Sequence, residues 1–152
     1  MATRSLIGKQ NTDGSIRAIY CHWNGDITGV GATLVEYYDE AKLEMLLDGG
    51  DISSLCGDPA ATSFYRHRGE TNVDAKVYEN LANFIEACKN YDAEYAYLYK
   101  NGVWSFAWIF GGDEEFADVK MHIETNKITV SPRQRPRFII EPILQRWLQG
   151  QN

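Results

Sequence analysis

The sequence has few cysteines and no long apolar run. Its three cysteines are widely spaced and include no Cys-x-x-Cys motif, so the pattern indicates neither a disulfide framework nor a zinc ribbon. No stretch approaches the roughly 18 apolar residues that a membrane-spanning helix needs, and the first residues lack the apolar core of a signal peptide. We therefore expect a protein of the reducing cytoplasm, without a membrane segment.

Positive charge is scarce over most of the chain. The 152 residues carry a formal net charge of -6, and 44% of them are hydrophobic, a composition typical of one globular domain. Residues 127–152 instead contain five basic residues and one acidic residue. A general nucleic-acid-binding protein is ordinarily basic, so direct binding to nucleic acid is not expected. The uneven charge indicates a charged partner of another kind.

Two turn motifs, Asp13-Gly14 and Asn101-Gly102, predict β-hairpins, because these residue pairs adopt the backbone angles that a tight hairpin turn requires. Two further stretches toward the C-terminus also favour extended structure. Together they predict an antiparallel sheet with strands at 5–10, 15–23, 94–100, 103–110, 117–123 and 127–130.

Apolar periodicity and capping residues predict the helices. Asp39 and Asn80 precede two of the periodic stretches, where their side chains can accept hydrogen bonds from free backbone N–H groups. Residues 51–72 show little periodicity and are predicted to form a long loop, which in a compact domain is itself a hint of function. The whole chain, 1–152, is thus predicted to be a single α+β domain, an antiparallel sheet of hairpins packed with three to four helices. The helices are predicted at 30–38, 40–47, 80–91 and after Pro142.

The segment Ile-Tyr-Cys-His-Trp at 19–23 places a thiol beside an imidazole. Side chains alternate across a strand, so Cys21 points with Ile19 and Trp23 while His22 points to the opposite face. A nucleophile and its base must come within hydrogen-bond reach of each other, which neighbouring strand residues do not. We therefore interpret Cys21 as a core residue and predict no catalytic residue. The alternative is a small hydrolase or transferase that uses His22 or Cys21 with a partner from elsewhere in the chain.

His22, Trp23 and Asp26 lie where the predicted strand passes into a glycine-bearing loop, a place where binding residues concentrate. The glycines Gly29 and Gly31 lack the further residues of a phosphate-binding motif, so a tight helix entry is the favoured interpretation and no cofactor is expected. No pair of potential ligands has a recognised metal-ligand spacing, so no metal is predicted either.

Two arginine clusters suit an anionic ligand. Arg66, His67 and Arg68 stand together in the predicted loop, and Arg133 and Arg135 lie in a segment bounded by prolines. The planar guanidinium group recognises phosphate and carboxylate groups. These five residues are candidates for binding a small anionic nucleotide, together with His22, Trp23 and Asp26. Solvated surface charge is the alternative.

Residues 36–58 form a surface of the opposite sign, with seven acidic residues against Lys42 alone. A dense negative band can imitate a phosphate backbone to a host protein that binds nucleic acid. A solvated helix face is the alternative. We predict as partner-binding residues Glu36, Glu40, Glu44 and Asp48.

The hairpin around Asn101-Gly102 is rich in large rings, and its predicted register would gather them on one face of the sheet. Exposed rings in such number would promote aggregation, so the face is predicted to be core, or an interface in a homo-oligomer. The predicted cross-strand pairs are Tyr99 with Trp104, Tyr97 with Phe106, and Tyr95 with Trp108.

The N-terminal pattern IGKQNxDGSIxAIYCHW, followed by GGDISSL and weaker echoes at RHRGE and EYAYLY, resembles small accessory proteins encoded by bacteriophages and prophages, a group that carries no activity to transfer. Members of that group have an aspartate after the tryptophan, where this chain has Asn24. The resemblance implies a phage accessory protein that acts in the cytoplasm of a bacterial host.

Phage accessory proteins of this size often bind and disable a host component, such as a restriction or CRISPR nuclease or its nucleotide signal. We therefore expect a non-enzymatic protein that inhibits or sequesters such a component, either through the acidic surface or through an arginine-lined anion pocket. The partner would be a host protein or a small anionic nucleotide. A small hydrolase or transferase, and a structural protein that forms oligomers, are the alternatives.

Overall fold

The computed structural model describes residues 2–113 and 115–126. The strands of this part are β1 (Ser5–Gln10), β2 (Ile16–Cys21), β3 (Ile52–Ser54), β4 (Ser63–Phe64), β5 (Lys76–Tyr78), β6 (Tyr95–Lys100), β7 (Val103–Trp108) and β8 (Ala117–Asp118). Its α-helices are α1 (Ala32–Tyr37), α2 (Glu40–Gly49), α3 (Leu81–Asn90) and α4 (Val119–Asn126). None of these helices is long and apolar enough to cross a membrane.

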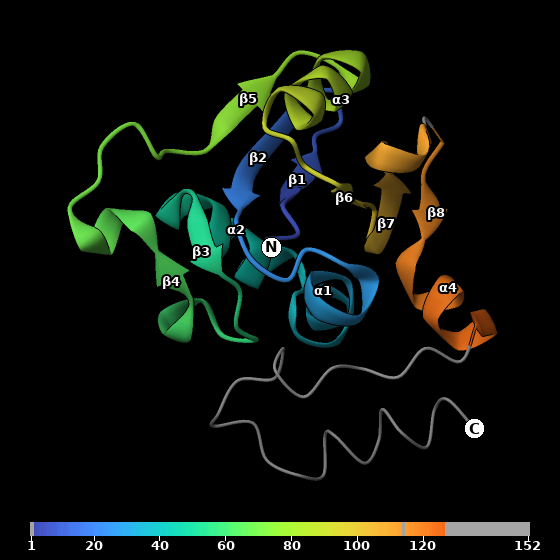
Figure 1. Cartoon of the computed structure of the whole chain (residues 1–152), viewed down its shortest axis with the longest axis horizontal. Coiled ribbons are helices and arrows are strands. Elements are labelled where there is room, and N and C mark those ends of the chain that lie inside the picture. The colour runs from blue at the N-terminus through green and yellow to red at the C-terminus, as the bar shows by residue number, and fades with distance from the viewer. Residues whose placement is uncertain (1, 114, 127–152) are drawn as a thin grey trace, which may run out of the picture.

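The strands form one mixed sheet in the order β4-β3-β2-β1-β6-β7-β8, with β5 also paired to β2 (Figure 1). The predicted α+β class is confirmed. Both predicted hairpins, β1–β2 and β6–β7, are antiparallel, but β1 pairs with β6, and β2 with β3, in parallel. Since a parallel pairing joins strands that are distant in the sequence, turn motifs do not reveal it.

Helices cover both faces of the sheet (Figure 1). On one face, α1, α2 and α4 enclose a core that includes Ile7, Ile19 and Tyr97. On the other face, Phe84 and Cys88 of α3 pack against small residues of the strands. A Cβ atom added at Gly8 would lie 2.8 Å from a methyl group of Ile16 and 3.4 Å from the Phe84 ring, so the glycine permits this close approach. Alternation along the strands separates the two cores.

The predicted hairpin register is confirmed. Tyr99 lies opposite Trp104, and the next two aromatic pairs follow in the predicted order. In the turn, Asn101 and Gly102 have φ angles of 52° and 80°, the left-handed values that favour Asn and Gly in hairpin turns. The predicted helix caps are also confirmed, since the side chains of Asp39 and Asn80 accept hydrogen bonds from the third residue beyond each of them.

The prediction of a loop over 51–72 is wrong in part, because β3, β4 and two short 3-10 turns lie within it. The prediction of a strand over 117–123 is also wrong beyond Asp118. The Asp118 carboxylate accepts a hydrogen bond from the Met121 backbone N–H, and α4 then buries Val119 and Ile123, whose spacing of four residues also fits a helix. The strand predicted at 127–130 and the helix predicted after Pro142 lie outside the described residues.

Candidate functional site

Cys21 is sealed in the core. Its side chain is completely buried, and its sulfur donates a hydrogen bond to the Trp23 carbonyl oxygen at 3.4 Å. Burial disfavours the charged thiolate, which raises the pKa of this thiol from its ordinary value of 9.0 to about 12. A nucleophilic cysteine needs the opposite, an accessible thiol with a lowered pKa, so Cys21 is suited to packing and not to catalysis.

His22 follows the last residue of β2 and is half-buried. Its Nδ1 shares a hydrogen bond of 2.7 Å with the Tyr20 hydroxyl group, and its ring meets the Trp23 ring edge-on at 4.7 Å between centroids. Tyr20 in turn stacks on Tyr91 at 5.3 Å. Tyr20 and His22 thus share one side of the strand end, away from the Cys21 sulfur, as strand alternation requires.

The glycine-bearing loop after His22 forms a π turn over Ile27–Gly31. The Asp26 backbone carbonyl accepts hydrogen bonds from the N–H groups of Gly29 and Gly31, so these two donors are engaged within the turn. The Asp26 carboxylate accepts a hydrogen bond of 2.7 Å from the Thr28 hydroxyl group. A Cβ atom at Gly31 would lie 3.3 Å from the Tyr97 ring. The glycines therefore shape a tight helix entry.

The side chains of the 65–68 turn contact neighbouring parts of the chain. Arg66 donates a hydrogen bond of 2.9 Å to the Asp48 backbone carbonyl and forms an ion pair with Asp74. The His67 ring lies edge-on to Phe64. The Arg68 guanidinium group lies 5.3 Å from the centroid of the Tyr65 ring. These contacts give each of the three basic residues a local partner, and Arg133 and Arg135 lie outside the described residues.

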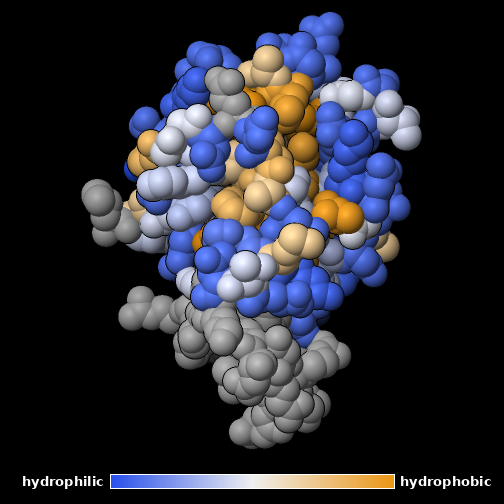
Figure 2. Space-filling view, turned by 90° about the vertical axis from the view of Figure 1, so that its right-hand side faces the viewer, coloured by the Kyte–Doolittle hydropathy of each residue, from blue (hydrophilic) through white to orange (hydrophobic). Residues whose placement is uncertain are grey.

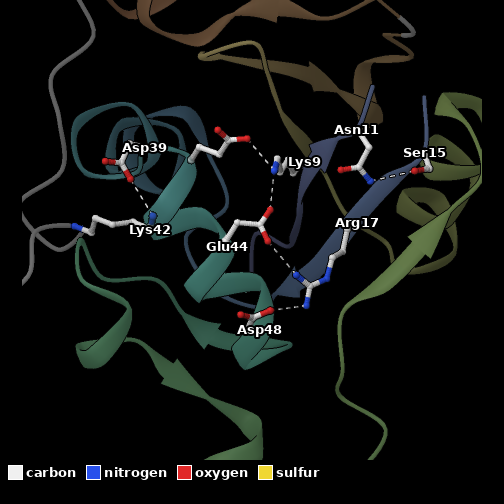
Figure 3. Close-up of polar contacts among 9 residues, drawn as sticks. Lys9, Asn11, Ser15, Arg17, Asp39, Lys42, Glu44 and Asp48 are labelled. Atoms are coloured by element: carbon white, nitrogen blue, oxygen red, sulfur yellow. Dashed lines mark hydrogen bonds and ion pairs between the residues drawn. The ribbon is translucent and has the colours of Figure 1, made fainter. Parts of the chain in front are cut away.

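The predicted acidic surface is joined to the sheet by a row of ion pairs (Figure 3). Lys9 of β1 contacts Glu40 and Glu44 of α2 at 2.9 and 2.8 Å. Arg17 of β2 contacts Glu44 at 3.4 Å and Asp48 at 2.9 Å. We call these five residues the ion ladder. Because two sheet cations face three helix carboxylates, most of the negative charge on this side of α2 is matched within the chain.

Two adjoining hollows lie beside the ion ladder, where the 35–40 segment faces the tip of the β6–β7 hairpin. The first has a volume of about 490 Å³ and the second about 520 Å³. Tyr99 and Gly102 line both, so we treat the two hollows as one groove, called the tyrosine groove. The remaining lining of the first hollow is Val35, Glu36, Tyr37, Tyr38, Asp39, Val103, Trp104, Asp118 and Lys120. The remaining lining of the second is Lys9, Gln10, Asn11, Thr12, Glu40 and Asn101.

The walls of the tyrosine groove are fixed by hydrogen bonds. The Trp104 indole Nε1–H donates to the Tyr38 backbone carbonyl at 3.0 Å, which joins the hairpin to the segment between α1 and α2. The Asp39 and Asp118 carboxylates cap α2 and α4, so both are held in place by helices. Tyr99 meets Trp104 edge-on at 5.1 Å. A preformed concave surface of this size is typical of a binding site.

The structure brings some of the predicted site residues together and separates others. Glu36 and Glu40, from the predicted partner-binding set, line the tyrosine groove, while Glu44 and Asp48 belong to the ion ladder alone. The hairpin register predicted Tyr99 and Trp104 as a cross-strand pair, but no sequence pattern placed them in a binding site. Asp118 was not predicted as a lining residue, because the stretch around it was predicted to be a strand.

The aromatic hairpin contributes mainly to the core, since Tyr97, Trp104 and Phe106 are buried. Trp108 and Phe110 are 46% and 61% exposed. Viewed from the side of β7 and β8, the surface shows a central apolar band flanked by hydrophilic residues (Figure 2). The predicted alternative, an interface between copies of the chain at the exposed rings of the hairpin, stays a prediction.

The described residues contain no group of three or more His, Cys, Asp or Glu side chains that could hold a metal ion. Comparison with known proteins finds no matching family model, curated protein or solved structure.

Proposed function

We propose that this protein acts by binding and not by catalysis, and that it inhibits or sequesters a defence component of a bacterial host. The observation that carries the proposal is the lining of the tyrosine groove. Carboxylates and aromatic rings surround its first hollow, and the described lining there includes no serine, threonine, cysteine or histidine. Such a surface supplies recognition, and its described lining lacks the serine, cysteine and histidine side chains that form the usual pairs of nucleophile and base.

The buried thiols support the same proposal. Cys21 and Cys88 are both completely buried, and burial raises the pKa of each to about 12. The N-terminal pattern resembles that of phage accessory proteins, which supports a partner in a bacterial host. The acidic residues of the groove favour a host protein with a positively charged contact surface over an anionic nucleotide, since like charges repel.

The test of the proposed function is made in a bacterium whose restriction or CRISPR system blocks a phage. We expect production of the full chain to raise the plating efficiency of that phage at least tenfold. Glu36→Lys should abolish the gain, because it places a positive charge in the groove, whereas Glu86→Lys on the exposed face of α3 should preserve it.

Two results would count against this proposal. If Glu36→Lys protects the phage as well as the unaltered chain does, the acidic surface is not the contact. If the purified chain turns over a substrate, the non-enzymatic assignment is wrong.

A further inference from the structure

The tyrosine groove has a shape that suits an extended chain carrying long side chains. Its two hollows, of about 490 and 520 Å³, meet at Tyr99 and Gly102. Ligand pockets in proteins usually measure roughly 300–1,000 Å³, so each hollow has room for a large side chain.

The charge in the groove favours a cationic occupant. Among the described residues that line the first hollow, Glu36, Asp39 and Asp118 are the acidic ones and Lys120 is the one cation. In the second hollow, Lys9 is already paired with Glu40 and Glu44. A carboxylate has about four lone-pair positions, so Asp39 and Asp118 retain acceptor capacity while each accepts one hydrogen bond as a helix cap.

The aromatic rings favour the same occupant. Tyr99 is half-buried between the two hollows, and a cation near the face of a tyrosine ring is attracted by its negative electrostatic potential. The chain itself provides an example outside the hollows, where the Lys42 ammonium group lies 5.3 Å from the centroid of the Tyr38 ring and donates a hydrogen bond to the Gly57 carbonyl. Carboxylates beside rings are suited to arginine in particular, whose planar group both stacks and donates paired hydrogen bonds.

We propose that the tyrosine groove binds an extended, arginine-bearing segment of the partner protein, with an arginine side chain entering the first hollow. This inference rests on the proposed function for its setting. It does not depend on which host component is bound, because it concerns the chemistry of the segment alone. The charge complementarity of the groove identifies the occupant.

The test uses the full chain and a defined probe, the acetylated and amidated peptide Gly-Arg-Gly-Arg-Gly. Amide and indole NMR signals are followed during a titration at low salt. We expect saturable shifts for residues 35–39 and 102–104, including the Trp104 indole N–H. The peptide in which citrulline replaces arginine, which has nearly the same shape but no charge, should bind at least tenfold more weakly.

Matched variants separate the groove from general charge. Asp39→Asn with Asp118→Asn keeps two good capping residues and should weaken binding of the arginine peptide at least tenfold. Glu79→Gln with Glu86→Gln changes the net charge equally, at exposed positions beside and within α3, and should change affinity less than twofold. Tyr99→Leu should also weaken binding several-fold.

The proposal is overturned if the two double variants lose affinity equally, or if the NMR shifts lie outside the groove. Equal affinity for the peptide with lysine in place of arginine would overturn the choice of arginine. If the arginine peptide binds in the groove but the protein fails to protect a phage, only the proposed function fails. Protection without peptide binding would refute this inference alone.

Discussion

Cys21 and Cys88 make the protein less stable as the pH rises through the alkaline range. Burial raises the pKa of both thiols to about 12, while the same groups in the unfolded chain titrate near their ordinary value of 9.0. Between these values the unfolded chain loses protons that the native chain keeps. Linkage therefore requires the free energy of unfolding to fall as the pH rises through this window.

We predict that Cys21→Ala flattens this decline. One pKa unit corresponds to about 1.4 kcal/mol, so between pH 8 and pH 10 the variant should lose about 1 kcal/mol less stability than the unaltered chain. Urea denaturation at the two pH values measures the difference. If both proteins lose the same free energy of unfolding between pH 8 and pH 10, the Cys21 thiol is not shielded from solvent.

Tyr97 is a second residue whose role can be isolated. Its ring is completely buried, and its hydroxyl group donates a hydrogen bond of 2.7 Å to the buried Gly25 carbonyl, which fixes the loop before α1. Tyr97→Phe keeps the ring but leaves this carbonyl without its partner. We expect a loss of about 1–2 kcal/mol in the free energy of unfolding.

The matched control for Tyr97 is Tyr99→Phe, on the same strand and half-buried. We expect it to cost less than about 0.5 kcal/mol, as measured by urea denaturation. Equal losses in both variants would mean that the Gly25 hydrogen bond does not stabilise the loop.

At the scale of elements, the ion ladder attaches α2 to β1 and β2. Glu44 contacts both Lys9 and Arg17, and the hydrogen bonds that Lys9 donates to Glu44 and Glu40 raise the pKa of Lys9. The side chains are partly exposed, so water and salt weaken the attraction. We predict that Glu44→Gln lowers the free energy of unfolding by about 0.5–1 kcal/mol at low salt, and by less than half of that in 1 M sodium chloride.

Glu86→Gln provides the comparison for the ladder, because Glu86 is exposed on α3 and its carboxylate takes no part in the ladder. We expect no measurable change in its unfolding at either salt concentration. If Glu44→Gln loses the same free energy of unfolding at both salt concentrations, Glu44 stabilises the protein by packing and not by electrostatic attraction.

The start of α3 depends on Asn80, whose side chain accepts a hydrogen bond of 2.9 Å from the Asn83 backbone N–H. Asn80→Ala should therefore cost about 1 kcal/mol in the free energy of unfolding, while Asn80→Asp should cost almost nothing, since aspartate caps equally well. Thermal unfolding of the two variants gives the comparison. Similar losses in both would show that the cap does not stabilise this helix.

Elements with local signals could be predicted from the sequence. The Asn101-Gly102 turn fixes the register of the β6–β7 hairpin, and Asp39 and Asn80 mark two helix starts. The pattern after Asp118 is ambiguous, because alternating apolar residues fit a strand while Val119 and Ile123 also fit one face of a helix. Packing against the core, which is a non-local effect, decides between the two.

At the scale of the whole molecule, the order of strands and the tyrosine groove lie beyond local patterns. The parallel pairing of β1 with β6 brings together segments some 90 residues apart, and no turn motif signals it. The groove exists because this pairing places the β6–β7 hairpin beside the 35–40 segment. The charge of Glu36 and Glu40 was therefore enough to identify them as candidates from the sequence. Their neighbours Tyr99 and Asp118 can be identified as lining residues only from the fold.

The central claim is that the molecule works by binding a partner in the tyrosine groove. Hydrogen–deuterium exchange of the full chain, alone and in complex with a host protein that it is proposed to inhibit, tests this most directly. We predict that binding slows exchange at backbone amides of residues 35–40 and 99–104. Slower exchange confined to residues 65–70, with the groove unchanged, would contradict the claim.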